Sequence, residues 1–268
     1  MERNERNERN ERDERNERAS ARLGELSTER LRAALAAGRP VVALVPVGSV
    51  EPHGPHLPLA TDTIISDAAA ARAVAKLEAA GLTAFVAPAV PYGVTRFAEG
   101  FAGAVSVPAP ALTAFLRAVV DGYLETGFAH VCLVNNHLEP AHDAAVRAAV
   151  ADRGGRASVA CPLTRRWART LSPEFKSGAC HAGEYETSLV LAAAPGTVDR
   201  AAAAGLPALT VSLSEGMKAG RASFREMGLD RAYTGAPARA TAEEGEAMLE
   251  KLATMIATEV TEGLAWKR

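Results

Sequence analysis

From about residue 20 onward the chain alternates between short, unbroken apolar runs and longer alanine-rich stretches. The run 41–47, Val-Val-Ala-Leu-Val-Pro-Val, is the clearest apolar one. It has no polar side chain on either face, which is typical of a strand buried on both sides of a sheet. By the same pattern we expect further strands over 82–90, 130–134 and 157–161.

Between these runs lie stretches with the composition and boundaries of helices. A glycine follows each of the first two stretches, and Pro140 fits the first turn of the third. We expect helices over 63–80, 110–126, 140–153, 184–194 and 242–262.

Strands separated by helices of this length predict an α/β fold with a mostly parallel sheet covered on both faces, a three-layer α/β/α sandwich. The chain has 268 residues, 48% of them hydrophobic, which is enough for one sizeable core. We therefore expect a single domain over 20–268.

Residues 1–18 are a near-perfect repeat of Glu-Arg-Asn with no hydrophobic residue after the initiator methionine. Such a segment buries no apolar surface that could offset the entropy lost on ordering. We expect a low-complexity, disordered tail over 1–19 that does not contribute to the folded domain.

Charge and cysteine content narrow the classes of partner and compartment. The 30 basic and 32 acidic residues give a net charge of -2, so no overall field favours nucleic acid or a membrane surface. Cys132, Cys161 and Cys180 have no metal-finger or redox spacing and are expected to be reduced thiols. Neither a signal peptide nor a run of about 20 apolar residues is evident. We expect a cytoplasmic protein.

Histidines and carboxylates gather where ligands bind in open α/β sheets, beyond the carboxyl ends of the strands. Glu51, His53 and Asp62 follow the first strand in a loop stiffened by prolines, and His137 and Glu139 follow the third. Imidazole nitrogen and carboxylate oxygen suit Zn²⁺ or Mn²⁺, and one carboxylate can bridge two ions. The pattern predicts a cage for divalent metal ions.

Each of these residues also has a simpler interpretation. Asp62 could be the N-cap of the helix that follows it, and Glu139 could favour a helix dipole. His137 alone would more often be a hydrogen-bonded structural histidine. The joint pattern favours ligands, because five of the six histidines lie in or beside loops or helix starts at this edge.

A third cluster spans 180–188, Cys-His-Ala-Gly-Glu-Tyr-Glu-Thr-Ser. His181 could act as a general acid or base, and Glu186 could orient it, accept a proton or bind metal. The alternative is a group of capping residues for the helix that follows. Cys180 is a rival nucleophile, which would need a base in reach that adjacency in sequence does not provide.

Together these segments resemble the creatininase family of creatinine amidohydrolase-like enzymes. The resemblance lies in residues 45–62, VPVGSVEPHGPHLPLATD, in 136–139, NHLE, and in 181–188, HAGEYETS, in the family's order. It covers about residues 40–195. It implies two divalent ions, one held by Glu51, Asp62 and His137, and the other by His53, Asp62 and Glu139.

The resemblance also assigns the remaining roles: His181 would carry the catalytic proton and Glu186 would be its companion. It implies a homo-oligomer, with a homohexamer as the family's assembly. Creatininase has a tyrosine where this chain has Leu138 and a Trp-Asp pair where it has Ser177 and Gly178. These aromatic and acidic contacts are missing, so we expect creatinine to be a poor substrate.

Relatives of this kind hydrolyse other bonds, including a formamide in deazaflavin-precursor synthesis and a peptide in redox-cofactor maturation. We therefore expect a dinuclear amidohydrolase that cleaves a C–N bond of a small cyclic amide, formamide or peptide-like substrate with metal-activated water. Arg165, Arg166 and Lys176 could meet an anionic substrate or form a solvated basic loop. The alternatives are a catalytically silent relative used for binding or assembly, and a hydrolase dependent on Cys180.

Overall fold

A computed structural model describes residues 21–266. Its centre is a four-stranded sheet of order β2-β1-β3-β4 in which every neighbouring pair is parallel. The strands are β1 (Val41–Val47), β2 (Thr83–Val86), β3 (His130–Asn135) and β4 (Ala157–Ala160). All four were predicted from apolar runs, although β2 ends four residues before the expected position 90.

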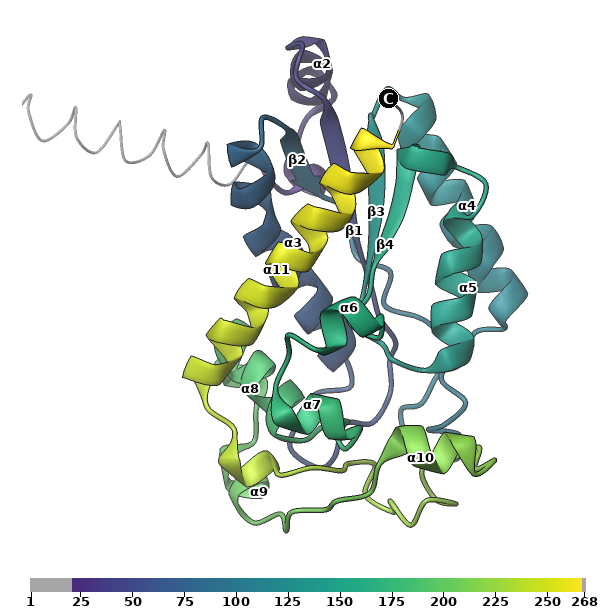
Figure 1. The fold of residues 1–268 in the computed structure, drawn as a ribbon, viewed down its shortest axis with the longest axis vertical. Coiled ribbons are helices and arrows are strands. Elements are labelled where there is room, and N and C mark those ends of the chain that lie inside the picture. Colours follow the sequence, from purple (N-terminus) through teal and green to yellow (C-terminus); the bar gives the residue numbers. More distant parts are fainter. Residues whose placement is uncertain (1–20, 267–268) are drawn as a thin grey trace, which may run out of the picture.

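Helices cover both faces of the sheet, which confirms the α/β/α sandwich (Figure 1). One face carries α3 (Thr61–Ala79), α8 (Glu184–Ala193) and α11 (Ala242–Ala265). The other face carries α4 (Ala109–Glu125) and α5 (Pro140–Val150). Within the described residues, none of the helices has the length and apolarity needed to cross a membrane.

Strand β1 shows why its apolar run is unbroken. Val42 and Leu44 pack in the core cluster beneath α3 and α11, whereas Ala43 and Val45 pack in the cluster beneath α4 and α5. Successive side chains of a strand point to opposite faces, so a strand covered on both sides must be apolar at every position.

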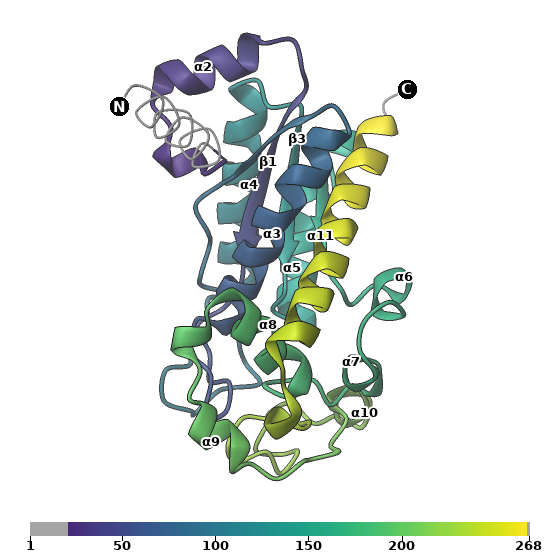
Figure 2. The same cartoon turned by 90° about the vertical axis from the view of Figure 1, so that its left-hand side faces the viewer.

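Short helices gather beyond the carboxyl end of the sheet, in the lower part of Figures 1 and 2. They are α6 (Arg165–Ala168), α7 (Pro173–Ser177), α9 (Arg200–Ala204) and α10 (Leu213–Lys218). The remaining elements are α2 (Thr28–Ala36) and the 3₁₀ turns η1 (Leu23–Glu25), η2 (Gly154–Arg156), η3 (Pro195–Thr197) and η4 (Pro237–Arg239). The tail expected over 1–19 lies outside the described residues.

Candidate metal centre

The predicted ligands come from the ends of the two central strands. The last residues of β1 and β3 pair with each other, so the loops that follow them start side by side. The loop after β1 carries Glu51 and His53, and the first turn of α3 carries Asp62. His137 follows β3. All four side chains are buried, with at most 3% of each residue exposed, so their charges must be compensated inside the protein.

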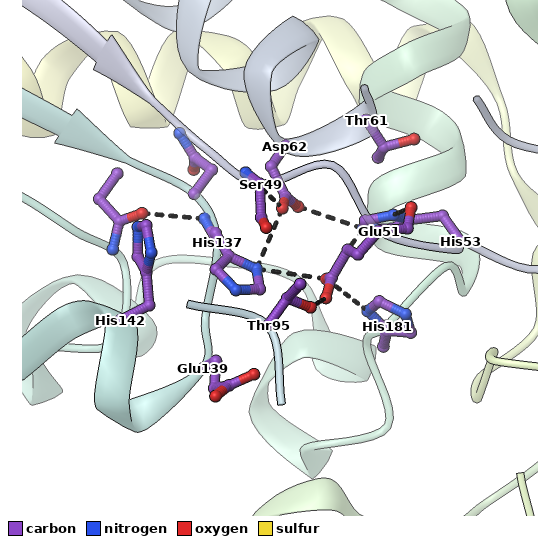
Figure 3. A network of polar contacts seen from close by, with 12 residues as sticks. Ser49, Glu51, His53, Thr61, Asp62, Thr95, His137, Glu139, His142 and His181 are labelled. Atoms are coloured by element: carbon purple, nitrogen blue, oxygen red, sulfur yellow. Dashed lines mark hydrogen bonds and ion pairs between the residues drawn. The ribbon is translucent and has the colours of Figure 1, made fainter. Parts of the chain in front are cut away.

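Glu51, Asp62 and His137 form a first set of donors (Figure 3). Nδ1 of His137 lies 3.2 Å from Oε1 of Glu51 and 3.0 Å from Oδ2 of Asp62. One donor atom of each residue lies within 4.8 Å of the other two. Two carboxylate oxygens and an imidazole nitrogen at this spacing can surround one divalent cation.

His53, Asp62 and Glu186 form a second set. Nε2 of His53 lies 3.1 Å from Oδ1 of Asp62 and 3.6 Å from Oε2 of Glu186. The two oxygens of Asp62 therefore face different sets, Oδ2 toward His137 and Oδ1 toward His53. This is the arrangement of a bridging carboxylate. Glu51 and His53 also form a third possible set with His181.

Glu139 lies apart from these sets. Its Oε2 accepts a hydrogen bond from the backbone N–H of Phe97 at 3.2 Å, and Figure 3 shows it away from the other carboxylates. Glu139 nevertheless lines a cavity that Glu51, Asp62 and His137 also line. Among residues 21–266, the structure thus brings Glu186 of α8 to the place beside His53 where the sequence predicted Glu139.

The three histidines share a hydrogen-bond pattern that fixes their tautomers. In each, the ring nitrogen remote from the carboxylates contacts a backbone carbonyl, which can only accept, so that nitrogen carries the proton. The inner nitrogen of a neutral ring then presents a lone pair to the cluster. The contacts are His53 Nδ1 to Glu51 O at 3.2 Å, His137 Nε2 to Val94 O at 2.7 Å and His181 Nε2 to Pro52 O at 3.0 Å.

His53 provides the test of whether a cation fits. Its Nε2 is buried and, within the described part of the chain, has no hydrogen-bond partner, although Oδ1 of Asp62 is 3.1 Å away. A buried imidazole nitrogen without a hydrogen-bond partner, beside a carboxylate oxygen, can be satisfied by a cation that contacts both atoms. These oxygen and nitrogen donors are those that Zn²⁺ and Mn²⁺ prefer, so the residues fit a divalent ion.

The pKa values of the cluster reflect its uncompensated negative charge. Burial lowers the pKa of His53, but the negative charge of Asp62 beside the ring outweighs burial and raises the pKa to about 10. Burial also lowers the pKa of His137, but the charges of Glu51 and Asp62 outweigh this effect and raise the pKa well above its usual value. Burial raises the pKa of Glu186 to about 8. The protein alone balances its carboxylates with protons, which cations would replace.

Polar neighbours hold the carboxylates in place and exclude the simpler role for Asp62. The N-cap position of α3 is Ala60, and Oδ2 of Asp62 instead accepts from the backbone N–H of Ser49 at 3.2 Å. Thr95 donates its hydroxyl hydrogen to Oε2 of Glu51. The sequence pattern did not identify Thr95, because a lone threonine in a loop carries no signal for such a contact.

His181 lines the cavity beside the donor residues. Its ring stacks on Phe224, with centroids 4.4 Å apart, and its Nδ1 lies 3.9 Å from Oε1 of Glu51 and 4.0 Å from Oε2 of Glu186. Burial, with the charge of His53, lowers its pKa to about 4, so the ring is neutral at pH 7. A neutral ring with its lone pair toward the cluster can accept a proton there.

The other candidates of the sequence pattern lie around this centre. Cys180 lines the cavity, but burial raises the pKa of its thiol above the usual range, which disfavours the thiolate that a nucleophile requires. His142 packs edge-on against His137, with centroids 4.6 Å apart, and His56 contacts the hydroxyl of Thr187 at 2.8 Å. Neither His56 nor His142 belongs to a donor set within the described residues.

Residues 24–260 match the family model described as "Creatininase: Creatinine amidohydrolase". The chain belongs to the creatininase family. A curated relative, the mycofactocin precursor peptide peptidase of Mycolicibacterium smegmatis, is 34% identical over 215 residues, which are 79% of this chain and 81% of the relative. The corresponding peptidase of Mycobacterium tuberculosis is 33% identical over 215 residues, 75% of this chain and 77% of that one.

Solved creatininase structures share the fold of this family member. The structure of a mutant creatininase with a single tryptophan replaced aligns with a TM-score of 0.68 and 22% identity over 91% of this chain and 98% of that chain. A structure titled "Creatininase Mn" aligns with a TM-score of 0.65 and 23% identity over the same shares. The chain is thus a creatininase-family hydrolase with buried clusters of histidine, glutamate and aspartate that are consistent with metal binding.

Proposed function

We propose that this creatininase-family chain is a dinuclear, metal-dependent amidohydrolase that cleaves a C–N bond of a small cyclic amide, formamide or peptide-like substrate. The observation that carries the proposal is the pair of buried donor sets that share Asp62, each with one of its oxygens. Two sets that share one carboxylate would suit a pair of divalent ions, which would activate water and polarise the substrate carbonyl.

Glu51, Asp62 and His137 would hold one ion. His53 and Asp62 would hold the other, with Glu186 in preference to Glu139 as the third ligand, because Glu186 lies within reach of His53 and Glu139 does not belong to that set. Glu139 lines the cavity and would face the substrate. Zn²⁺ and Mn²⁺ both suit these donors.

The ions, when bound, polarise a carbonyl group and lower the pKa of water toward about 7. His181 supplies what they cannot, a proton carrier: its Nδ1 faces Glu51 and Glu186, and its Nε2 is held by the carbonyl of Pro52. Nδ1 accepts a proton from the attacking water and passes it to the leaving nitrogen. Stacking on Phe224 keeps the ring in this orientation.

The curated relatives favour the peptide-like end of the substrate range. Two of them are named precursor peptide peptidases and share a third of their residues with this chain over most of its length. A catalytically silent family member is the competing interpretation, but the candidate ligands and His181 are all present, and all of them except His53 line one cavity.

Metal analysis and a substrate screen test the proposal together. Protein saturated with Zn²⁺ or Mn²⁺ is expected to hold two equivalents and to hydrolyse members of a panel of formamides, cyclic amides and short peptides, with creatinine among the poorest. Chelation should abolish the activity and the same metal should restore it. Two bound ions without hydrolysis of any member of the panel would favour the silent relative, and at most one ion would contradict the dinuclear centre.

A further inference from the structure

A second cavity adjoins the metal centre. It has a volume of about 450 Å³, within the range of about 300–1,000 Å³ that is common for small-molecule sites. Leu138, Cys180, Leu213 and Met217 line both cavities. The short helices α6, α7 and α10 supply much of the wall and lie together beyond the sheet (Figures 1 and 2). The two cavities are therefore neighbours that share a wall, so the second cavity lies next to a bond that reacts at the metal centre.

The second cavity is positively charged. Arg165, Arg169 and Lys176 line it, and no aspartate or glutamate of the described residues 21–266 does. All three are exposed, and within residues 21–266 their side chains make no ion pair or hydrogen bond. Arg166, the other arginine expected to meet a substrate, pairs with Glu262 at 2.7 and 2.8 Å and is not part of the wall. Three unpaired cations thus stand beside the route to the metal centre.

The same wall is apolar between the charges. Phe175 and Ala168 lie in it, and Leu163 is one of the few large hydrophobic residues that the described structure exposes, with 42% of its surface accessible. Ligand pockets are commonly lined by apolar side chains with a few charged groups that fix the orientation of the ligand. An apolar wall and a cationic rim complement a ligand with an apolar body and an anionic end.

We propose that this cavity binds the carboxylate end of an acylated amino acid or short peptide. The terminal carboxylate meets Arg165, Arg169 and Lys176, and an apolar side chain packs on Phe175 and Leu163. The amide to be cleaved then lies at the metal centre. Water adds across the C–N bond, so the acyl part leaves as a carboxylic acid and the part in the second cavity leaves with a free amino group. This substrate class rests on the proposed amide hydrolysis and narrows it.

Binding of two matched probes tests the cavity without turnover. 3-Phenylpropanoate and 4-phenylbutan-2-one have the same apolar body, differ in the charge of the terminal group and contain no amide bond, and both can be titrated calorimetrically into the metal-loaded protein. We expect the carboxylate to bind about tenfold more tightly than the ketone, because it gains charge-assisted bonds to several cations. The preference should weaken as salt is added, since the cations are exposed.

A triple variant, Arg165→Gln, Arg169→Gln and Lys176→Gln, should bind both probes about equally, whereas Arg166→Gln should keep the preference for the carboxylate. A carboxylate that binds the metal ions directly would keep its advantage in the triple variant, and that result would overturn the proposal. So would equal binding, or no binding, of the two probes by the unaltered protein.

Failure of this inference is distinguishable from failure of the proposed function. If amides are hydrolysed at the same rate with and without a terminal carboxylate, and the triple substitution does not change that rate, the proposed role of the cavity is contradicted. The proposed metal chemistry is then unaffected. A carboxylate preference that depends on the three cations, in a metal-loaded protein that hydrolyses no amide, would support the cavity and contradict the catalysis.

Discussion

Asp62 is the residue on which both donor sets depend, because each of its oxygens faces a different histidine. Replacing it with alanine should therefore remove both ions together, as measured by elemental analysis after dialysis against Zn²⁺ or Mn²⁺. Asp121→Asn is a matched control, since Asp121 pairs with Arg153 outside the centre and should leave two equivalents bound. Loss of a single ion from Asp62→Ala would show that Asp62 does not bridge.

Metal analysis also distinguishes a catalytic role of His181 from a role as a metal ligand. His181 lies near Glu51 and His53 and is also a geometrically possible ligand. If it carries a proton, His181→Ala should keep both ions and most of the substrate affinity while kcat falls by about 10²–10⁴-fold. Loss of an ion from this variant would show that His181 is a ligand. Full activity of the variant would show that another group transfers the proton, with Glu186 the next candidate.

The raised pKa values in the cluster predict that metal binding releases protons. At pH 7 the ion-free protein keeps His53, His137 and Glu186 protonated, because the pKa values of His53 and Glu186 are about 10 and 8 and that of His137 is well above normal. Each must lose its proton to become a ligand. Titration with Zn²⁺ in buffers of different ionisation enthalpy should show release of up to three protons, and affinity should rise from pH 6 to pH 8. Binding that is independent of pH would contradict these protonation states.

At the scale of elements, α11 crosses α8 closely enough that a single glycine decides the packing. A Cβ at Gly245 would overlap the backbone carbonyl of Ser188, which lies two residues after Glu186 in α8. Gly245→Ala should destabilise the protein by about 1–3 kcal/mol in urea unfolding. Gly122→Ala is the matched control, because Gly122 lies within α4 with open space around it and alanine there should stabilise by about 0.5–1 kcal/mol. Equal effects of the two substitutions would show that the close crossing does not matter.

The elements that the sequence predicted well are those with long patterns. The apolar run of β1 is unbroken over 7 residues and the alanine-rich α3 extends over 19, and the ends of both elements lie within two residues of the expected positions. The short helices α6, α7 and α10 were not predicted, because a few residues show no period. They form much of the second cavity, so the wall beside the metal centre could be found only from the structure.

The candidate site likewise has one part that the sequence predicted and another that only the structure reveals. Glu51, Asp62 and His137 could be predicted together because they follow adjacent parallel strands, whose carboxyl ends must meet. The sequence could not decide which glutamate joins His53 and Asp62, because Glu139 and Glu186 both lie at a helix start near the predicted ligand edge. Only the placement of α8 brings Oε2 of Glu186 within 3.6 Å of Nε2 of His53. The contact between His181 and Phe224 likewise joins segments that carry no common pattern.

For the whole molecule, two expectations from the sequence stay predictions. The homohexamer would appear in light scattering as six times the chain mass of 28.0 kDa.

Deleting residues 1–18 should leave metal binding unchanged, because the repeat has no apolar residue after the initiator that could join either core cluster. Both concern parts or partners beyond the described residues 21–266.

The metal centre joins segments that are distant in the chain. They are the loop after β1, the start of α3, the loop after β3 and the start of α8. Ions bound there should therefore stabilise the molecule as a whole. An ion at one hundred times its Kd stabilises the folded state by about 2.7 kcal/mol, which for a chain of this size corresponds to a rise in Tm of about 5–10 °C. Chelation, which would remove both proposed ions, should therefore lower the Tm by at least that amount, and Zn²⁺ or Mn²⁺ should restore it, as measured by calorimetry. The Asp62→Ala variant should show no response to either treatment. A Tm that is the same with and without chelator in the unaltered protein would mean that these buried carboxylates are balanced by protons alone.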